Sequence, residues 1–133
     1  MKQIAFVDEL VVLAPKAIPS LARLVAFGGP LTVFVQRLGC SYTDRLLTYL
    51  TQASARGYRI LEIGTLEGIV RLVESGLGVA AMPRVFASGH ARGREVHLLQ
   101  LPHALRTLET YVVAPATSDA FFAACERFAI CAK

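Results

Sequence analysis

Two hydroxyl residues, Ser41 and Thr65, have surroundings that suit the binding of an anion. Each follows a run of β-forming residues that ends near a glycine, and each opens a stretch with helical periodicity. The first N–H groups of a helix lack partners within it, and the helix dipole favours negative charge there. If the two strands are parallel, we expect both helices to begin at one crevice, with Met82 and Pro83 ending a third strand nearby. The alternative is that both hydroxyls serve only as N-caps.

The other reactive residues predict no catalytic or metal site. Cys40 lies at a predicted helix start, where a thiol's pKa falls, but no histidine stands at a motif spacing to act as its base, so a buried thiol is favoured. The three cysteines include no CxxC pair and predict no disulfide framework. The segment LEIGTLEG is similar to the nucleotide-binding turn of S-adenosylmethionine methyltransferases, but Leu66 replaces its second glycine. We therefore expect no enzyme, no cofactor and no metal.

Apolar periodicity, glycines and prolines divide the chain into alternating strands and helices, which is typical of an α/β fold. Residues 58–83 predict strand, helix and strand, with the two strands parallel. The last strand of this unit is a continuous apolar run and is expected to be buried on both faces. The other expected elements are strands at 10–14, 31–36, 96–101 and 108–114, helices at 18–27, 42–54 and 119–130, a helical turn at 84–88, and a loop at 89–93.

Composition bounds the class of protein. The 133 residues suffice for one small domain with a core, and no apolar run reaches the roughly 18–20 residues that span a bilayer. The N-terminus lacks the pattern of a signal peptide, so we expect a cytoplasmic protein. The net charge of +4 is mild, and the local basic cluster at 90–94 is read as a solvated loop rather than a nucleic-acid patch. The hydrophobic fraction of 54% suggests that part of the surface is covered, either by a partner subunit or by a missing part of the same protein.

Three segments, taken in order, resemble the effector-binding region of LysR-type transcriptional regulators: 39–42, 61–69 and 76–83. The resemblance implies a periplasmic-binding-protein-like (type 2) α/β architecture of two subdomains joined by two crossing strands. It places one complete subdomain at 31–107, a remnant of the first subdomain with a hinge at 1–30, and its returning strand and helix at 108–133. The ligand-binding residues that it implies are Gly39, Cys40, Ser41, Tyr42, Gly64, Thr65 and Leu66, with Met82 and Pro83 nearby.

The function that follows is an effector-binding regulatory domain that senses a small anionic metabolite in the cleft between subdomains. The expected partners are this effector and further copies of the chain, with no membrane. DNA is expected to be bound only through a helix-turn-helix domain that is absent from this chain. Two alternatives remain open: a stand-alone small-molecule binding module and, as the weaker one, a methyltransferase-like enzyme.

Overall fold

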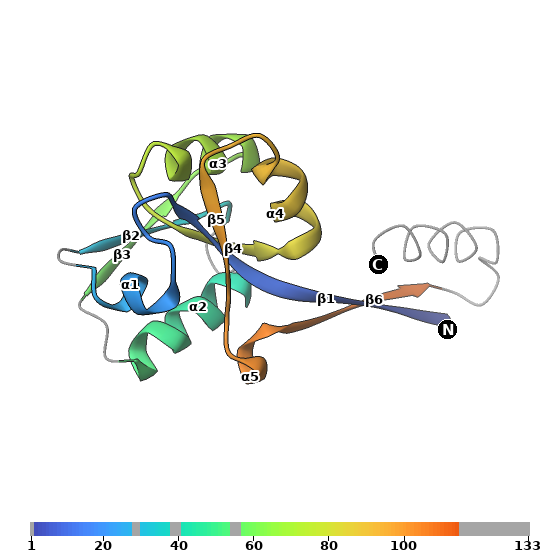
Figure 1. The fold of residues 1–133 in the computed structure, drawn as a ribbon. Helices are drawn as coiled ribbons and strands as arrows, with labels where there is room; N and C mark the ends of the chain where they lie inside the picture. Colours follow the sequence, from blue (N-terminus) through green and yellow to red (C-terminus); the bar gives the residue numbers. More distant parts are fainter. Residues whose placement is uncertain (1, 28–29, 38–40, 54–56, 115–133) are drawn as a thin grey trace.

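The computed structural model describes residues 2–27, 30–37, 41–53 and 57–114, with side chains described between 7 and 107. Strands and helices alternate along most of this length (Figure 1). The elements are β1 (Lys2–Pro15), α1 (Leu21–Val25), β2 (Leu31–Val35), α2 (Ser41–Gln52), β3 (Tyr58–Glu62), α3 (Leu66–Glu74), β4 (Ala80–Pro83), α4 (Arg84–Ala91), β5 (Val96–Gln100), α5 (His103–Arg106) and β6 (Thr107–Ala114).

The strands of the main body follow the order β3-β2-β4-β1-β5. β2 and β3 pair in parallel, and a parallel bridge from Val33 to Val79 connects β2 to the residue before β4. β1 lies antiparallel between β4 and β5, so Val11 is opposite both Met82 and Gln100. All strands of the body except β1 therefore run in the same direction. We call this sheet, together with α1 to α4, the body.

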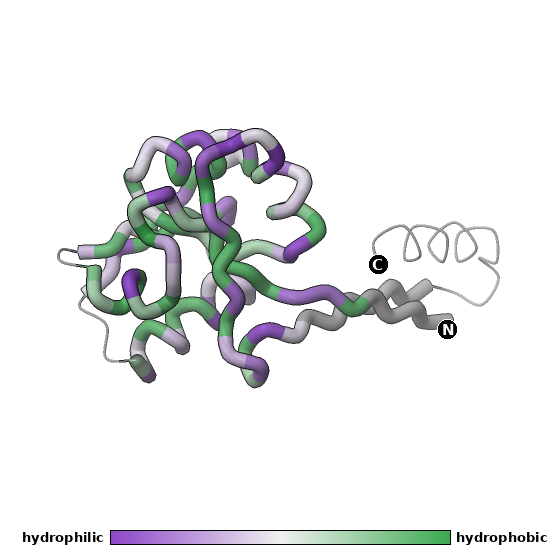
Figure 2. The backbone as a smooth tube through the Cα atoms, viewed as in Figure 1, coloured by the Kyte–Doolittle hydropathy of each residue, from purple (hydrophilic) through white to green (hydrophobic). Residues whose placement is uncertain are grey.

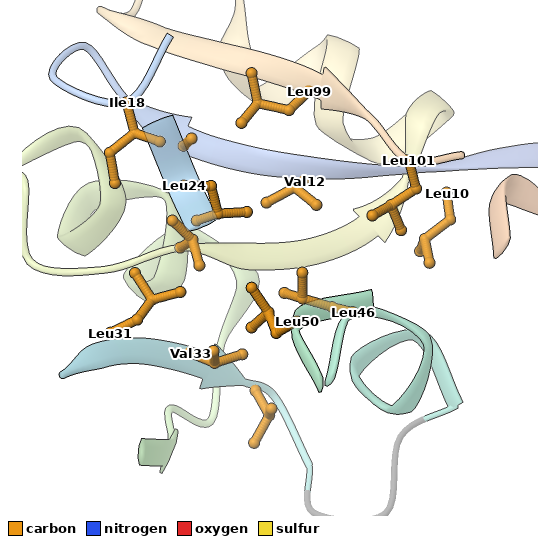
Figure 3. Packing of buried hydrophobic residues seen from close by; sticks show 13 residues of the cluster. Leu10, Val12, Ile18, Leu24, Leu31, Val33, Leu46, Leu50, Leu99 and Leu101 are labelled. Carbon is orange, nitrogen blue, oxygen red and sulfur yellow. The ribbon is translucent and has the colours of Figure 1, made fainter. Parts of the chain in front are cut away.

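Helices cover both faces of the sheet. Alternate residues of β1 enter two separate hydrophobic clusters: Leu10 and Val12 join the cluster beneath α1 and α2, whereas Val11 and Leu13 join the cluster beneath α3 and α4. Figure 3 shows the first of these clusters between the strands and α2. Figure 2 shows apolar stretches on β1 and β2, whose residues within the body are buried from both sides of the sheet.

The N-terminal part of β1 leaves the body. Residues 2–9 pair antiparallel with residues 107–114 of β6, and this two-stranded segment extends away from the body (Figure 1). We call it the ribbon. Within the described helices, none has both the length and the apolar composition needed to cross a bilayer.

Most of the predicted elements are confirmed, with four differences. β1 begins at Lys2 rather than near residue 10, because β6 extends its pairing. α4 continues to Ala91, so the expected loop at 89–93 is wrong over its first part. The short helix α5 was not predicted. α1 spans Leu21–Val25 rather than 18–27, because Ser20 caps its start and Ala26 its end. β3 and β4 are parallel, as expected, and β2 lies between them. The predicted helix at 119–130 lies outside the described residues.

Residues 10–25 pack into the body. Leu10, Ile18 and Leu24 are buried in the same cluster as Leu31 and Val33. The expected domain boundary at residue 30 therefore does not coincide with a break in packing. The described chain instead changes its surroundings near residue 9, where β1 leaves β4 and β5 for the ribbon.

Two glycines make the turn from α3 into β4 possible. Gly76 has φ +84°, a left-handed conformation that ends the helix at little steric cost. At Gly78, an added Cβ would lie 2.5 Å from the carbonyl oxygen of Thr32 and 2.7 Å from Cε2 of Phe34. Only glycine lets this segment approach β2 closely enough for the Val79 amide to donate to the Thr32 carbonyl at 2.9 Å.

Candidate functional site

The sheet brings the predicted site residues to one edge. β2, β3 and β4 run in the same direction, and each is followed by a helix, α2, α3 or α4 respectively. The starts of these three helices therefore lie at the carboxyl edge of the sheet, where ligands bind in open α/β sheets. Ser41, Thr65 and Pro83 mark the three starts.

Thr65 is an N-cap, as predicted. It has extended dihedrals (φ −134°, ψ 146°), and its Oγ1 accepts a hydrogen bond from the Gly68 amide at 3.1 Å. The side chain is exposed beside the exposed Gly64, while Leu66 is half-buried. A hydroxyl that accepts from the backbone still has its own hydrogen to donate, so Thr65 can cap α3 and contact a ligand at the same time.

Ser41 is the first residue of α2 and is exposed. Gly39 and Cys40, which precede it in the sequence, lie outside the described residues. Tyr42 is half-buried and packs against the cluster beneath α2, so the structure gives its ring a role in packing.

The helices α2 and α3 begin at the same edge but lie on opposite faces of the sheet (Figure 1). The expectation of one crevice between two facing helix starts needs this correction. The reason is topological: β2 lies between β3 and β4, so the chain crosses the sheet on one face through α2 and on the other through α3. A ligand that contacts both helices would have to lie across the ends of β2 and β3.

Met82 and Pro83 are buried and form part of the packed end of β4. Pro83 is the N-cap residue of α4, and α4 has no capping hydrogen bond from this residue's side chain. The acceptor comes from β1 instead, because Oδ2 of Asp8 accepts from the Val85 amide at 3.3 Å. Met82 and Pro83 thus shape the edge, while the polar group beside them is one that the sequence did not single out.

Four polar residues near the start of α4 were not singled out from the sequence as candidate site residues: Asp8, Glu9, Arg84 and Gln100. Oε2 of Glu9 accepts from Nε of Arg84 at 3.1 Å and from Nε2 of Gln100 at 3.2 Å. The hydrogen bond from Gln100 is the largest influence lowering the pKa of the Glu9 carboxyl; Arg84 and the charge of Arg106 lower it further, against partial burial. The available signal was two adjacent carboxylates inside an otherwise apolar strand.

The first turn of α3 carries a compensated charge. Oε1 of Glu67 accepts from Arg71 at 3.0 Å and from Arg94 at 2.9 Å, and Nδ1 of His90 lies 3.7 Å from its Oε2. The hydrogen bond from Arg71 is the main cause that lowers the pKa of Glu67, with the charges of Arg94, Arg71 and His90 adding to it. Because the guanidinium groups of Arg71 and Arg94 lie against Glu67, its carboxylate repels an anion beside Thr65 less strongly.

The structure also has a surface hollow along α2, which is separate from the predicted site residues. It has a volume of about 430 Å³ and is lined by residues from the first turn of α2 to its end: Asp44, Leu47, Thr48, Thr51 and Gln52. It includes none of the predicted site residues. A ligand site at the carboxyl edge is therefore supported by topology and capping geometry and not by this hollow.

Comparisons with known proteins agree on one family. A family model described as the LysR substrate binding domain matches residues 3–128. The chain is 29% identical over 123 residues to YusT, an uncharacterized HTH-type transcriptional regulator of Bacillus subtilis (strain 168), covering 92% of this chain and 40% of that protein. It is 37% identical over 71 residues to YofA, an HTH-type transcriptional regulator of the same strain, covering 53% of this chain and 25% of YofA. The chain thus spans less than half the length of these relatives.

A solved structure shows the same fold at low sequence identity. A variant of the OxyR2 regulatory domain from Vibrio vulnificus matches with a TM-score of 0.65 and 14% identity, covering 97% of this chain and 64% of that one. Together with the family match, this confirms the expected α/β fold of the type 2 periplasmic-binding-protein-like class.

Proposed function

This chain belongs to the LysR substrate-binding domain family, and we propose that it binds a small anionic effector at the carboxyl edge of its sheet. The observation that carries this proposal is that β2, β3 and β4 end at one edge, each followed by a helix start. The exposed hydroxyls of Ser41 and Thr65 lie at two of these starts. Backbone N–H groups and hydroxyls at such positions favour a carboxylate or phosphate ligand.

The proposed site includes the residues that family resemblance assigns to it. We place Ser41, Tyr42, Gly64, Thr65 and Leu66 against the ligand, and Met82 and Pro83 in the wall beside it. Gly39 and Cys40 belong to the same proposed site, although they lie outside the described residues. In this proposal the ribbon corresponds to the two crossing strands between subdomains, and the effector lies between the body and the other subdomain.

We assign the chain a regulatory and non-enzymatic role. The curated relatives are transcriptional regulators, and a ligand that closes the cleft would shift the equilibrium between two arrangements of the whole protein. Homo-oligomers are the proposed assembly. DNA binding is proposed for the parts of the longer relatives that this chain does not match. The alternative of a methyltransferase predicts S-adenosylmethionine binding in calorimetry, which our proposal does not.

Thr65→Val tests the site because it removes one hydroxyl and nearly preserves the side-chain volume. The matched control is Ser20→Ala, which removes another N-cap hydroxyl, the one that accepts from the Arg23 amide at 3.2 Å on α1. Both variants should lose about 1 kcal/mol of stability through the missing cap. Only Thr65→Val should also weaken the binding of whichever acid emerges from a thermal-shift screen of carboxylic acids, amino acids and phosphate esters.

Affinity and stability must be measured on the same samples, by calorimetry and urea unfolding. If both variants bind the acid as tightly as the parent, Thr65 is only a cap and the proposed site is wrong. If both weaken binding equally, the effect follows lost stability and Thr65 is again no ligand contact.

A further inference from the structure

The ribbon leaves the body at the same edge as the proposed site. Leu10 is opposite Pro83 in the pairing of β1 with β4, and Glu9 is opposite Thr107 in the pairing of β1 with β6. Residues 8–9 therefore lie where the strand passes from body to ribbon. Figure 2 shows a hydrophilic stretch of β1 at this point, between apolar stretches on either side.

Two carboxylates tie β1 to the body at this point. Asp8 accepts from the Val85 amide and supplies the cap that Pro83 does not provide to α4. Glu9 binds Arg84 at the start of α4 and Gln100 at the end of β5. These bonds connect residues that are 75 to 91 positions apart in sequence, so they hold tertiary structure rather than a local turn.

A third side chain ties β6 to the body from the opposite face. Nη1 of Arg45, on α2, donates to the backbone carbonyl of Thr107, the first residue of β6, and lies 3.5 Å from the carbonyl oxygen of Leu105. Each strand of the ribbon is thus held by a polar side chain at its base, one through α4 and the other through α2.

We propose that Asp8, Glu9 and Arg45 are positioning residues that fix the direction in which the ribbon leaves the body. We call these three residues the ribbon clamp. Two paired strands on their own are marginally stable, so a ribbon that is free at its base would both change direction and open more often. Polar contacts at the base, on both faces of the sheet, oppose both movements.

The clamp acts on the ligand-free chain and does not depend on the proposed effector. The clamp nevertheless attaches the ribbon to α2 and α4, which are two of the three helices that begin at the carboxyl edge. A movement at the start of α2 would therefore be transmitted to the base of the ribbon through Arg45, and a movement at the start of α4 through Asp8 and Glu9.

Amide hydrogen exchange of the full 133-residue chain, without ligand, tests the clamp. The double variant Asp8→Asn with Glu9→Gln, and separately Arg45→Met, should speed exchange of the paired amides at 2–9 and 107–114 by about fivefold or more. Amides of β2 and β3 should change by a smaller factor than those of the ribbon, because the clamp residues contact the base of the ribbon and not these two strands. The matched controls are Glu95→Gln and Lys16→Met, which remove an exposed pair 3.8 Å apart near the other end of β1.

Three results would overturn the proposal: ribbon exchange that does not change, ribbon exchange that rises equally in the controls, or exchange that rises by the same factor in β2 and β3. The last result would assign the three residues to global stability. Asp8→Asn alone, which keeps a side-chain oxygen for the Val85 amide, should give an intermediate effect in the ribbon if the double variant unfolds.

Discussion

Thr65 and Asp8 both place a side-chain oxygen at the first turn of a helix, but they leave different room for a ligand. Thr65 is neutral, exposed and adjacent to its own helix. Asp8 reaches α4 from a strand 77 residues earlier and brings a negative charge to the Val85 amide. A second anion at α4 would meet the Asp8 carboxylate, and like charges in one site repel each other. The start of α3 is therefore the better place for an anionic effector than the start of α4.

The pH dependence of stability should reveal the Glu9 contacts. Hydrogen bonds from Gln100 and Arg84 lower the pKa of Glu9 in the folded chain below its unfolded value of about 4.3. The stability that Glu9 contributes is therefore complete above that unfolded value and is lost as the pH falls through the lower folded value. Glu9→Gln should be less stable than the parent at pH 7, and the difference should shrink towards pH 3.

Urea unfolding of both proteins at a series of pH values measures this difference. A gap in the free energy of unfolding that stays constant from pH 7 to pH 3 would contradict an ionised Glu9 as the source of the contact. Glu67 has its own lowered pKa and is present in both proteins, so its titration cancels in the comparison.

At the scale of elements, the sequence predicted those strands and helix caps that depend on neighbouring residues. The strand at 31–36 and the cap at Thr65 follow from neighbouring residues, and the structure confirms them, with the strand ending at Val35. The length of β1 could not be predicted in this way, because residues 2–9 are strand through pairing with a segment about a hundred positions away. The clamp was missed for the same reason. Asp8 and Glu9 are disfavoured within a lone strand and are explained only by α4 and β5.

The candidate site was predicted in part. The spacing of strands, glycines and hydroxyls located the starts of α2 and α3, because the signals that begin a helix are local. The N-cap is confirmed for Thr65, whereas Ser41 is the first residue of α2. Which face each helix covers depends on the order of strands, and a sequence does not show that β2 separates β3 from β4.

Gly78→Ala tests the close approach of β2 and the segment leading into β4. The new methyl group would meet the Thr32 carbonyl, a backbone atom that cannot move without disturbing β2. We expect a loss of about 1–3 kcal/mol in the free energy of unfolding. Gly89→Ala is the control: nothing lies within 4 Å of its added Cβ, and its helical position should tolerate or favour alanine. Urea unfolding that shows equal stability for the two variants would refute the close contact.

At the scale of the whole molecule, the structure changes where association is expected. Residues 11–13 of β1 pair on both sides within the body, whereas β6 is paired on one side only, with residues 2–9 of β1. Within the described ranges, the outer strand of the body beside β2 is β3. All five residues of β3 are exposed, including Tyr58, Ile60 and Leu61. An exposed apolar edge strand favours pairing with another chain.

Leu61→Lys should therefore weaken self-association. Leu61 is 50% exposed on β3, and a lysine there would bring charge to the edge, a common means of preventing strand pairing. Leu77→Lys is the matched control, because Leu77 is 59% exposed but lies in the turn after α3. Sedimentation equilibrium across micromolar concentrations should show the parent and Leu77→Lys associating, with Leu61→Lys shifted towards monomer. A parent chain that is monomeric throughout this range would refute association through β3. Equal dissociation of both variants would show that β3 is not the specific contact, because each substitution adds the same charge at an equally accessible leucine.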